Sequence, residues 1–326
     1  MSSNLGSAIA NPNIAFIKYW GNSNDKLRIP SNSSISMNLA GLETNTSVKF
    51  QIDLASDQLL LNGQDAETSA TKRVSSFLDI VREMAGIQER AAVESTNNFP
   101  MGSGIASSAS AFAALALAAS QAAGLSLDEK QLTILARKGS GSASRSIPQG
   151  FVEWHAGDQD GNSYAESFAP ANHWDLIDCI AVVDEDHKDT GSSIGHTTAG
   201  TSPYQAARVK GSLDRISIVK KAILEKDFES FAKIVEYDSL LMHGVMLTSR
   251  PSLLYWSAAS VRVLKACKKL SEEGISLATT MDAGPNVHVI CLSKEKDDLV
   301  EQLEHIQGVK HVLVARVGGA ARMATK

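Results

Sequence analysis

The order of strand-like and helix-like segments constrains the fold of this 326-residue chain more than any single motif does. The first half alternates short runs rich in Val, Ile, Phe and Leu with helical segments, and residues from Ser202 onward are mostly helical. The segment 277–317 then has the pattern strand, turn, strand, helix, strand. Helices followed by a β-β-α-β ending predict an α+β fold in which helices pack on sheets.

The expected helices follow from apolar periodicity and capping residues. They are Ala66–Met84, Ser108–Ala123, Ser126–Lys138 (with Ser126 and Glu129 as a capping box), Pro203–Leu224, Phe228–Leu241, Pro251–Glu273 and Lys294–Ile306. The segment 184–202 interrupts this pattern, and roughly 100–200 residues per domain predicts two domains. We expect the domains to be residues 1–185 and 186–326.

Charge and composition exclude several classes of protein. A hydrophobic fraction of 43% and a charged fraction of 21% are typical of a folded chain rather than a disordered one. The formal net charge is −5 and no run of five Lys or Arg occurs, which argues against nucleic acid or anionic lipid as the main partner. The apolar stretch Ala109–Ala119 is too short to span a bilayer.

The cysteine pattern and the N-terminal residues indicate a compartment. Cys179, Cys267 and Cys291 are odd in number and far apart, and no Cys/His cluster has zinc-ligand spacing. We therefore expect a reducing environment and no metal ion held by such a cluster. The first residues lack the basic and apolar regions of a secretory signal, so we expect a cytoplasmic protein.

A Gly/Ser loop at Phe99–Ser110 runs directly into an alanine-rich helix. Gly102 and Gly104 allow a tight turn and close approach of the backbone to a ligand, and free N–H groups at a helix start favour an anion. No GK[ST] closes the loop as in a Walker A motif, and Ser107 stands where a Rossmann fingerprint has its third glycine. A phosphate-binding loop and a plain turn before a buried helix both remain open from this segment alone.

Three further segments carry candidate chemistry. Lys138–Arg145 is Gly/Ser-dense and ends in an arginine that suits a bidentate grip on a carboxylate or phosphate, unless that arginine is simply solvated. Asp282 follows a predicted buried strand, where a partly desolvated carboxylate acts as a base, or it is an ordinary turn former. Lys18 lies among Ile, Phe, Tyr and Trp, so it either meets an acid or phosphate or extends from an edge strand into water.

Together the motifs carry a resemblance that none carries alone. In order they are NPNIAFIKYWGN, IPSNSSISMNL, PMGSGIASSAS, SGSASRS and MDAGPN, spread over nearly the whole chain. This series resembles the mevalonate diphosphate decarboxylases of the GHMP kinase superfamily, with phosphomevalonate decarboxylases as a subgroup. The resemblance implies a two-domain α+β fold, with an N-terminal ribosomal protein S5 domain 2-like part and a C-terminal ferredoxin-like sandwich. It also implies ATP and Mg²⁺ as cofactors, a phosphorylated mevalonate as substrate, and a homodimer.

The resemblance also assigns roles to residues of this chain. Asp282 engages the substrate 3-hydroxyl, Lys18 lies beside it, and Arg145 holds the C1 carboxylate. The residues that line the ATP phosphates are Gly102, Ser103, Gly104, Ser107 and Ser108. The remaining substrate contacts are Tyr19, Asn22, Ser140, Ser142 and Ser192, the last facing the transferred phosphoryl group.

The chain departs from the family pattern at the phosphate end of the substrate. Asn22 replaces a lysine, Ser193 replaces an arginine of some relatives, and His196 replaces a methionine. Each lost cation removes a charged hydrogen bond worth roughly 1.5–3 kcal/mol. We therefore favour mevalonate 5-monophosphate as substrate, giving isopentenyl phosphate.

The main alternative is mevalonate 5-diphosphate, with the lost charge supplied by Arg28, Lys72, Arg73, Lys188 or Arg208. A mevalonate-type kinase that stops after phosphorylation is a further alternative, as is a silent nucleotide-binding sensor. Joint retention of Asp282, Lys18 and Arg145 argues against both, because neither needs an aligned carboxylate clamp.

Overall fold

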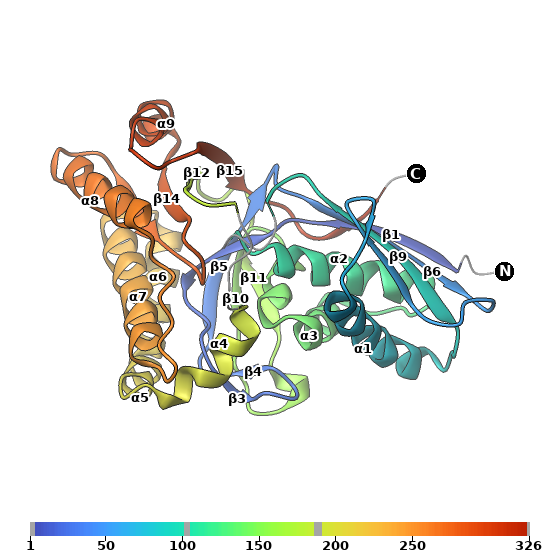
Figure 1. The fold of residues 1–326 in the computed structure, drawn as a ribbon. Coiled ribbons are helices and arrows are strands. Elements are labelled where there is room, and N and C mark those ends of the chain that lie inside the picture. The colour runs from blue at the N-terminus through green and yellow to red at the C-terminus, as the bar shows by residue number, and fades with distance from the viewer. Residues whose placement is uncertain (1–3, 101–104, 186–190, 325–326) are drawn as a thin grey trace.

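Two large sheets, each covered by helices, make up the protein (Figure 1). The computed structural model describes residues 4–100, 105–185 and 191–324, without the side chains of residues 192 and 193. The helices are α1 (Thr68–Ala85), α2 (Ser107–Ala122), α3 (Glu129–Gly139), α4 (Ser192–Thr198), α5 (Gln205–Lys210), α6 (Ser212–Glu225), α7 (Phe228–Thr248), α8 (Ala258–Glu272) and α9 (Lys296–Glu304). A 3₁₀ segment, η1 (Gly141–Ser146), follows α3.

The strands come from both ends of the chain. They are β1 (Leu5–Ala10), β2 (Asn13–Ile17), β3 (Asn22–Asn24), β4 (Ile29–Pro30), β5 (Ser34–Ala40), β6 (Thr44–Gln51), β7 (Gln58–Leu61), β8 (Gln64–Asp65), β9 (Arg90–Asn97), β10 (Phe151–Trp154), β11 (Ala165–Ala169), β12 (Leu176–Val182), β13 (Leu277–Thr280), β14 (Val287–Leu292), β15 (His311–Val317) and β16 (Arg322–Met323). This mixture of helices and mostly antiparallel sheets, with β7 and β9 as a parallel pair, confirms the predicted α+β class.

The smaller of the two large sheets has the strand order β16-β1-β6-β9-β7-β8. Residues of β6 alternate between buried and more exposed, which is typical of a sheet with one covered face. Apolar side chains of α1, α2 and α3 bury that face. The small side chains of α2 allow the helix to approach very closely, so that a Cβ added at Gly6 of β1 would lie 2.1 Å from the carbonyl oxygen of Ala118.

The larger sheet joins segments that are distant in the sequence. Its order is β11-β10-β5-β15-β12-β14-β13, with β2 paired to β5. Strand β15 pairs with both β5 and β12, so strands from either side of residue 185 share one sheet. The domain division at residue 185 stays a prediction.

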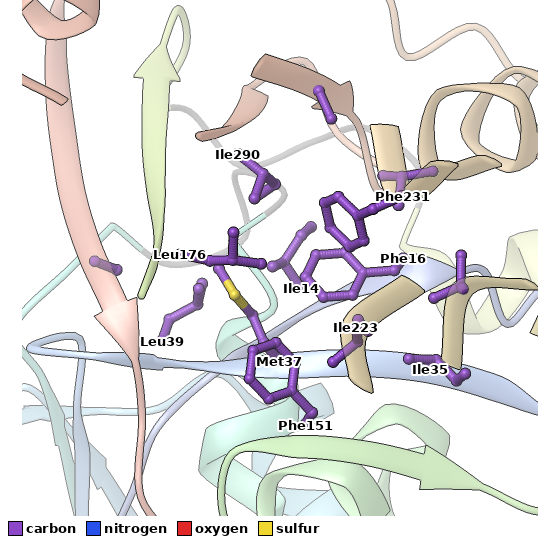
Figure 2. Packing of buried hydrophobic residues seen from close by; sticks show 14 of the residues in the cluster. Ile14, Phe16, Ile35, Met37, Leu39, Phe151, Leu176, Ile223, Phe231 and Ile290 are labelled. Carbon is purple, nitrogen blue, oxygen red and sulfur yellow. The ribbon is translucent and has the colours of Figure 1, made fainter. Parts of the chain in front are cut away.

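Helices cover both faces of this larger sheet. On one face, α6 and α7 pack on a cluster that includes Phe16 and Phe231, whose ring centroids are 4.8 Å apart (Figure 2). On the other face, α8 and α9 pack on Ile177, Cys179 and Val289. The all-buried pattern of β12 follows from this double cover, whereas β2 is covered by α6 and α7 on one side and by η1 on the other.

Several predicted boundaries are wrong for local reasons. The helix expected over 203–224 is two helices, α5 and α6, because Gly211 ends the first. The helix expected from Pro251 begins at Ala258, where Ser257 and Ser260 form a capping box. The capping box expected at Ser126 lies at Asp128 and Gln131 instead.

Gly6→Ala should destabilise the fold by about 3 kcal/mol, because its methyl group would overlap the backbone of α2. The free energy of unfolding from chemical denaturation measures this. Gly161→Ala is the matched control, since a Cβ there meets nothing within 4 Å. Equal stability of the two variants would contradict the described packing of β1 on α2.

Candidate active site

An ion pair between a buried lysine and a partly exposed aspartate joins segments that are far apart in the chain. Strand β2 is buried along its whole length and leads directly to Lys18, whose side chain is 1% exposed. Asp282 lies in the turn between β13 and β14, and its Oδ1 is 2.6 Å from Lys18 Nζ. The predicted contact between Lys18 and Asp282 is therefore present.

The turn that carries Asp282 is fixed by Asn286. The Asn286 side chain accepts from the backbone N–H groups of Val183 and Asp184, at 2.8 and 3.1 Å, and donates to the Asp184 carbonyl at 2.9 Å. The MDAGPN turn is thus attached to the end of β12. This rigidity is what the buried-strand-then-turn pattern predicts.

Competing effects set the ionisation of the pair. Burial acts to raise the pKa of Asp282, but the charge and hydrogen bond of Lys18, with smaller contributions from His288 and Arg145, hold that pKa below its ordinary value. Burial lowers the pKa of Lys18 more than Asp282 and Asp238 raise it. The depressed pKa of Asp282 means that this side chain is a carboxylate at neutral pH, the form that can accept a proton.

The backbone on either side of Lys18 is fixed by buried charged groups that sequence reasoning missed. Asp238 of α7 accepts from the Lys18 backbone N–H at 2.6 Å and from Arg215 Nε at 2.6 Å. Arg208 donates to the carbonyls of Lys18 and Trp20, at 3.2 and 2.7 Å. The only signal in the sequence is charged residues on otherwise apolar helix faces.

Arg208 is 2% exposed and serves this backbone scaffold. The hypothesis that it compensates for a lost phosphate contact is therefore wrong. Its guanidinium is already used by Lys18 and Trp20, by the Asn32 carboxamide at 2.8 Å and by Gln205 at 3.1 Å.

Arg145 is 2% exposed and oriented by two side chains that sequence reasoning also missed. Its Nε donates to Asn13 Oδ1 at 3.2 Å, and its Nη1 donates to Ser34 Oγ at 2.6 Å. Asn13 in turn donates to the Ser142 carbonyl and to Ser146 Oγ. Both Asn13 and Ser34 lie in the motifs NPN and IPSNSS, so their place beside recognised motifs could have identified them.

Arg145 and Asp282 lie within electrostatic reach of each other. Burial lowers the pKa of Arg145 to about 10 against the opposing charge of Asp282. Within the described part of the chain, Arg145 Nη2 has no hydrogen-bond partner. One guanidinium edge is thus available for a carboxylate near the Lys18–Asp282 pair.

The start of α2 fits a phosphate group. Its N-cap residue, Ala106, has φ 52° and no capping side chain, and no acidic residue occupies the first turn. The first N–H groups of such a helix lack intrahelical partners and favour an anion. Ser107 and Ser108 begin this helix, and Ser108 Oγ lies 3.3 Å from Ser140 Oγ. Gly102, Ser103 and Gly104 lie outside the described residues.

No group of three or more His, Cys, Asp or Glu that could hold a metal ion occurs within residues 4–100, 105–185 and 191–324. A nucleotide Mg²⁺ ion, which is held largely by phosphate oxygens and water, does not require such a group.

Tyr19 and the η1 segment form the predicted phosphate end of the site. The Tyr19 ring lies against Gly141, where an added Cβ would be 2.6 Å from it, and stacks on His196 at 4.1 Å. Tyr19 donates to Asn22 Oδ1 at 2.5 Å, and Asn22 donates to Asp25 at 2.8 Å. Burial raises the pKa of Tyr19, so its hydroxyl remains neutral.

The structure gives contacts for two of the other three predicted substrate residues. The Ser142 carbonyl is used by Asn13, and Ser140 ends α3 beside Ser108. Ser192 begins α4, but its side chain lies outside the described residues. Two of the candidate compensating cations also lie at the end of α3: Arg28 Nε donates to the Lys138 carbonyl at 3.1 Å, and Arg73 Nη2 donates to the Gly139 carbonyl at 2.9 Å. Lys188 is outside the described residues.

The two-domain mixed fold is of the GHMP kinase type, and comparisons with known proteins identify the family. The family model "Diphosphomevalonate decarboxylase-like N-terminal domain" matches residues 10–165. The model "Mevalonate 5-diphosphate decarboxylase C-terminal domain" matches residues 179–323. The chain therefore belongs to the diphosphomevalonate decarboxylase family.

Individual relatives of the chain belong to the same family. The diphosphomevalonate decarboxylase of Candida albicans is 36% identical over 97% of this chain and 94% of its own length. The human protein of that name is 34% identical over 90% of this chain and 78% of its own.

Solved structures have the same fold. A mevalonate diphosphate decarboxylase from Staphylococcus aureus has a TM-score of 0.93 at 37% identity, covering 98% of both chains. A structure described as "MDDEF in complex with MVAPP, AMPPCP and Magnesium" also has a TM-score of 0.93, at 38% identity and with 99% of both chains covered.

Asp282→Asn should lower turnover by roughly 10²–10⁴-fold, because the amide cannot accept a proton from a substrate hydroxyl. Nucleotide binding, measured by calorimetry with ATP, should remain within a few-fold. Asp297→Asn, an 89% exposed side chain on α9, is the control and should leave turnover unchanged. Turnover of the Asp282 variant within tenfold of the parent would contradict its assignment.

Proposed function

We propose that this protein catalyses the ATP-dependent decarboxylation of a 5-phosphorylated mevalonate. The observation that carries the proposal is the 2.6 Å contact between the buried Lys18 side chain and Asp282, together with the buried Arg145 guanidinium whose charge acts on Asp282. The start of α2, whose N-cap residue Ala106 has no side-chain capping bond and whose first turn holds no acidic residue, is a place for nucleotide phosphates. When bound, ATP supplies the phosphoryl group that turns a tertiary hydroxyl into a leaving group, and Mg²⁺ neutralises its charge.

The residues of the chain accept the hydroxyl proton and hold the carboxylate of the substrate. Asp282 orients the substrate 3-hydroxyl and accepts its proton, and the Lys18 charge keeps Asp282 ionised until then. Arg145 holds the C1 carboxylate in one plane through its planar guanidinium, so that the C–C bond to be broken is aligned. Asn13 and Ser34 fix that plane.

The names of the relatives favour the diphosphate as the substrate over the monophosphate that we expected from the sequence. Arg28 and Arg73 support it, since their guanidinium groups bond to the carbonyls of Lys138 and Gly139 at the end of α3 and supply positive charge in place of the lysine that is absent at position 22. We therefore propose mevalonate 5-diphosphate as the first candidate.

The monophosphate is the second candidate, and a specific observation favours it. Asn22 is neutral, and its carboxamide is already paired with Tyr19 and with the acidic side chain of Asp25. Such an arrangement suits a less negative ligand.

We further propose a homodimer. Exposed Tyr237, Leu240 and Leu247 along α7 support it. A cytoplasmic location stays a prediction. No helix in the described part of the chain is both long and apolar enough to cross a membrane.

Steady-state rates with both phosphorylated mevalonates test the substrate. We expect a kcat/KM at least about tenfold higher for the diphosphate, and Asn22→Lys should raise that value by about tenfold more through one added charged hydrogen bond. Asn24→Lys, which adds the same charge on an exposed side chain of the same hairpin, is the control. A higher kcat/KM for the monophosphate would establish the second candidate, and ADP release without CO₂ would indicate a kinase.

Arg145→Lys keeps a positive charge but loses the planar fork. We expect CO₂ release to fall by at least about tenfold more than ATP affinity does, because a point charge does not align the carboxylate. Parallel measurement of CO₂ and of nucleotide binding checks this. Equal losses of both would indicate that Arg145 only supports the fold.

A further inference from the structure

A second buried charged pair lies in the larger sheet and has no part in the steps above. Asp178 Oδ2 on β12 is 2.6 Å from His288 Nδ1 on β14, and the side chains are 0% and 1% exposed. In the ladder between these strands, Asp178 is opposite Ile290 and His288 is opposite Ile180. The two charged side chains are therefore diagonal neighbours on the face that α6 and α7 cover, among the apolar residues of Figure 2.

Stability alone does not explain a charged pair in this place. Two apolar side chains of similar volume are commonly as stabilising as a buried ion pair, or more so, because both charges lose their hydration. The surrounding residues Ile180 and Ile290 would suit such a replacement. We therefore look for a role of the Asp178–His288 pair in the groups that lie near it.

The catalytic carboxylate lies next to the pair. The β13–β14 ladder places Thr280 opposite His288, two residues before Asp282. The charged groups that act on His288 are Asp178 from β12, Asp282 from the following turn and Lys18 from the end of β2. From α7, which covers this face, Asp238 acts on Lys18, and the charge of Lys18 helps to lower the pKa of His243.

The protonation state of His288 follows from these neighbours. Burial acts to lower the pKa of His288, but the charge and hydrogen bond of Asp178, together with Asp282, raise it above its ordinary value. His288 is in turn one of the groups, after Lys18, that lower the pKa of Asp282.

We propose that Asp178 and His288 form a positioning pair for Asp282, in which Asp178 keeps His288 protonated and the charge of His288 keeps Asp282 ionised in the free enzyme. Asp282 then has three cationic neighbours: Lys18, Arg145 and His288. His288 is a positioning residue, since it acts on the substrate only through Asp282. This inference rests on the proposed function, which gives Asp282 its role as proton acceptor.

The pH dependence of kcat/KM for CO₂ release tests the pair. His288→Gln removes the positive charge and keeps a polar side chain, so the acidic limb should move to higher pH by about 0.5–1 unit. Asp178→Asn should move it in the same direction, because His288 then loses its proton. The double variant should move the limb no further than His288→Gln does, because both lack the imidazolium charge and the double variant also lacks the Asp178 carboxylate. An unmoved limb in both single variants, or a limb moved to lower pH in Asp178→Asn, would overturn the proposal.

Asp57→Asn is the matched control for disruption of a buried pair. It breaks the 2.9 Å ion pair with Arg82, which lies in the half of the molecule built on the smaller sheet. This variant should lose stability with no movement of the acidic limb. Ionisation of the substrate phosphate is common to all variants and cancels in the comparison.

A measurement without substrate separates this proposal from the proposed function. Nitrogen NMR of the full chain should find the His288 imidazole charged at about pH 7.5 in the parent and neutral in Asp178→Asn. A neutral His288 in the parent overturns the positioning pair alone. Absence of CO₂ release by the parent with either phosphorylated mevalonate overturns the proposed function, and this inference with it.

Discussion

The buried ion pair between Lys18 and Asp282 is the interaction on which the rest of the structure depends. A lysine that is 1% exposed is tolerated only because it meets a carboxylate at 2.6 Å. Much of the surrounding architecture serves to bring these two groups together: β2 delivers one, the turn after β13 delivers the other, and Asn286 fixes that turn to β12. The resulting carboxylate has a lowered pKa and a side chain that is 26% exposed.

Arginine is used in two different ways around this pair. Arg208 donates hydrogen bonds to backbone carbonyls, and Arg215 donates to a backbone carbonyl and to Asp238. These bonds hold the chain around Lys18 in place. Arg145 is oriented from one side by Asn13 and Ser34, which leaves part of its guanidinium for a ligand. The same residue type therefore serves as scaffold at Arg208 and Arg215 and is the proposed recognition group at Arg145, and the number of occupied donors distinguishes them.

The α+β class could be predicted from the sequence because the order of strand-like and helix-like segments is a local signal. The ordered motifs carried the resemblance to the family, and the resemblance implied the Lys18–Asp282 contact. The strands at 5–10, 13–17 and 34–40 were missed, since their short, mixed sequences become strands through pairing with distant partners. Asp238 and His288 were missed for the same reason: a charged residue reveals its use only when its partner is known. The expectation that Arg208 contacts a phosphate was wrong because the charge of a residue does not tell whether its side chain is buried.

The pairing of β15 with both β5 and β12 has a consequence for how the protein is made. The larger sheet cannot close until residue 317 is available, so a nascent chain that has passed well beyond Lys18 and Arg145 still has β5 and β12 without the strand that joins them. The smaller sheet also receives its edge strand β16 from the last described residues, so both sheets are completed only when the C-terminal part of the chain has been made.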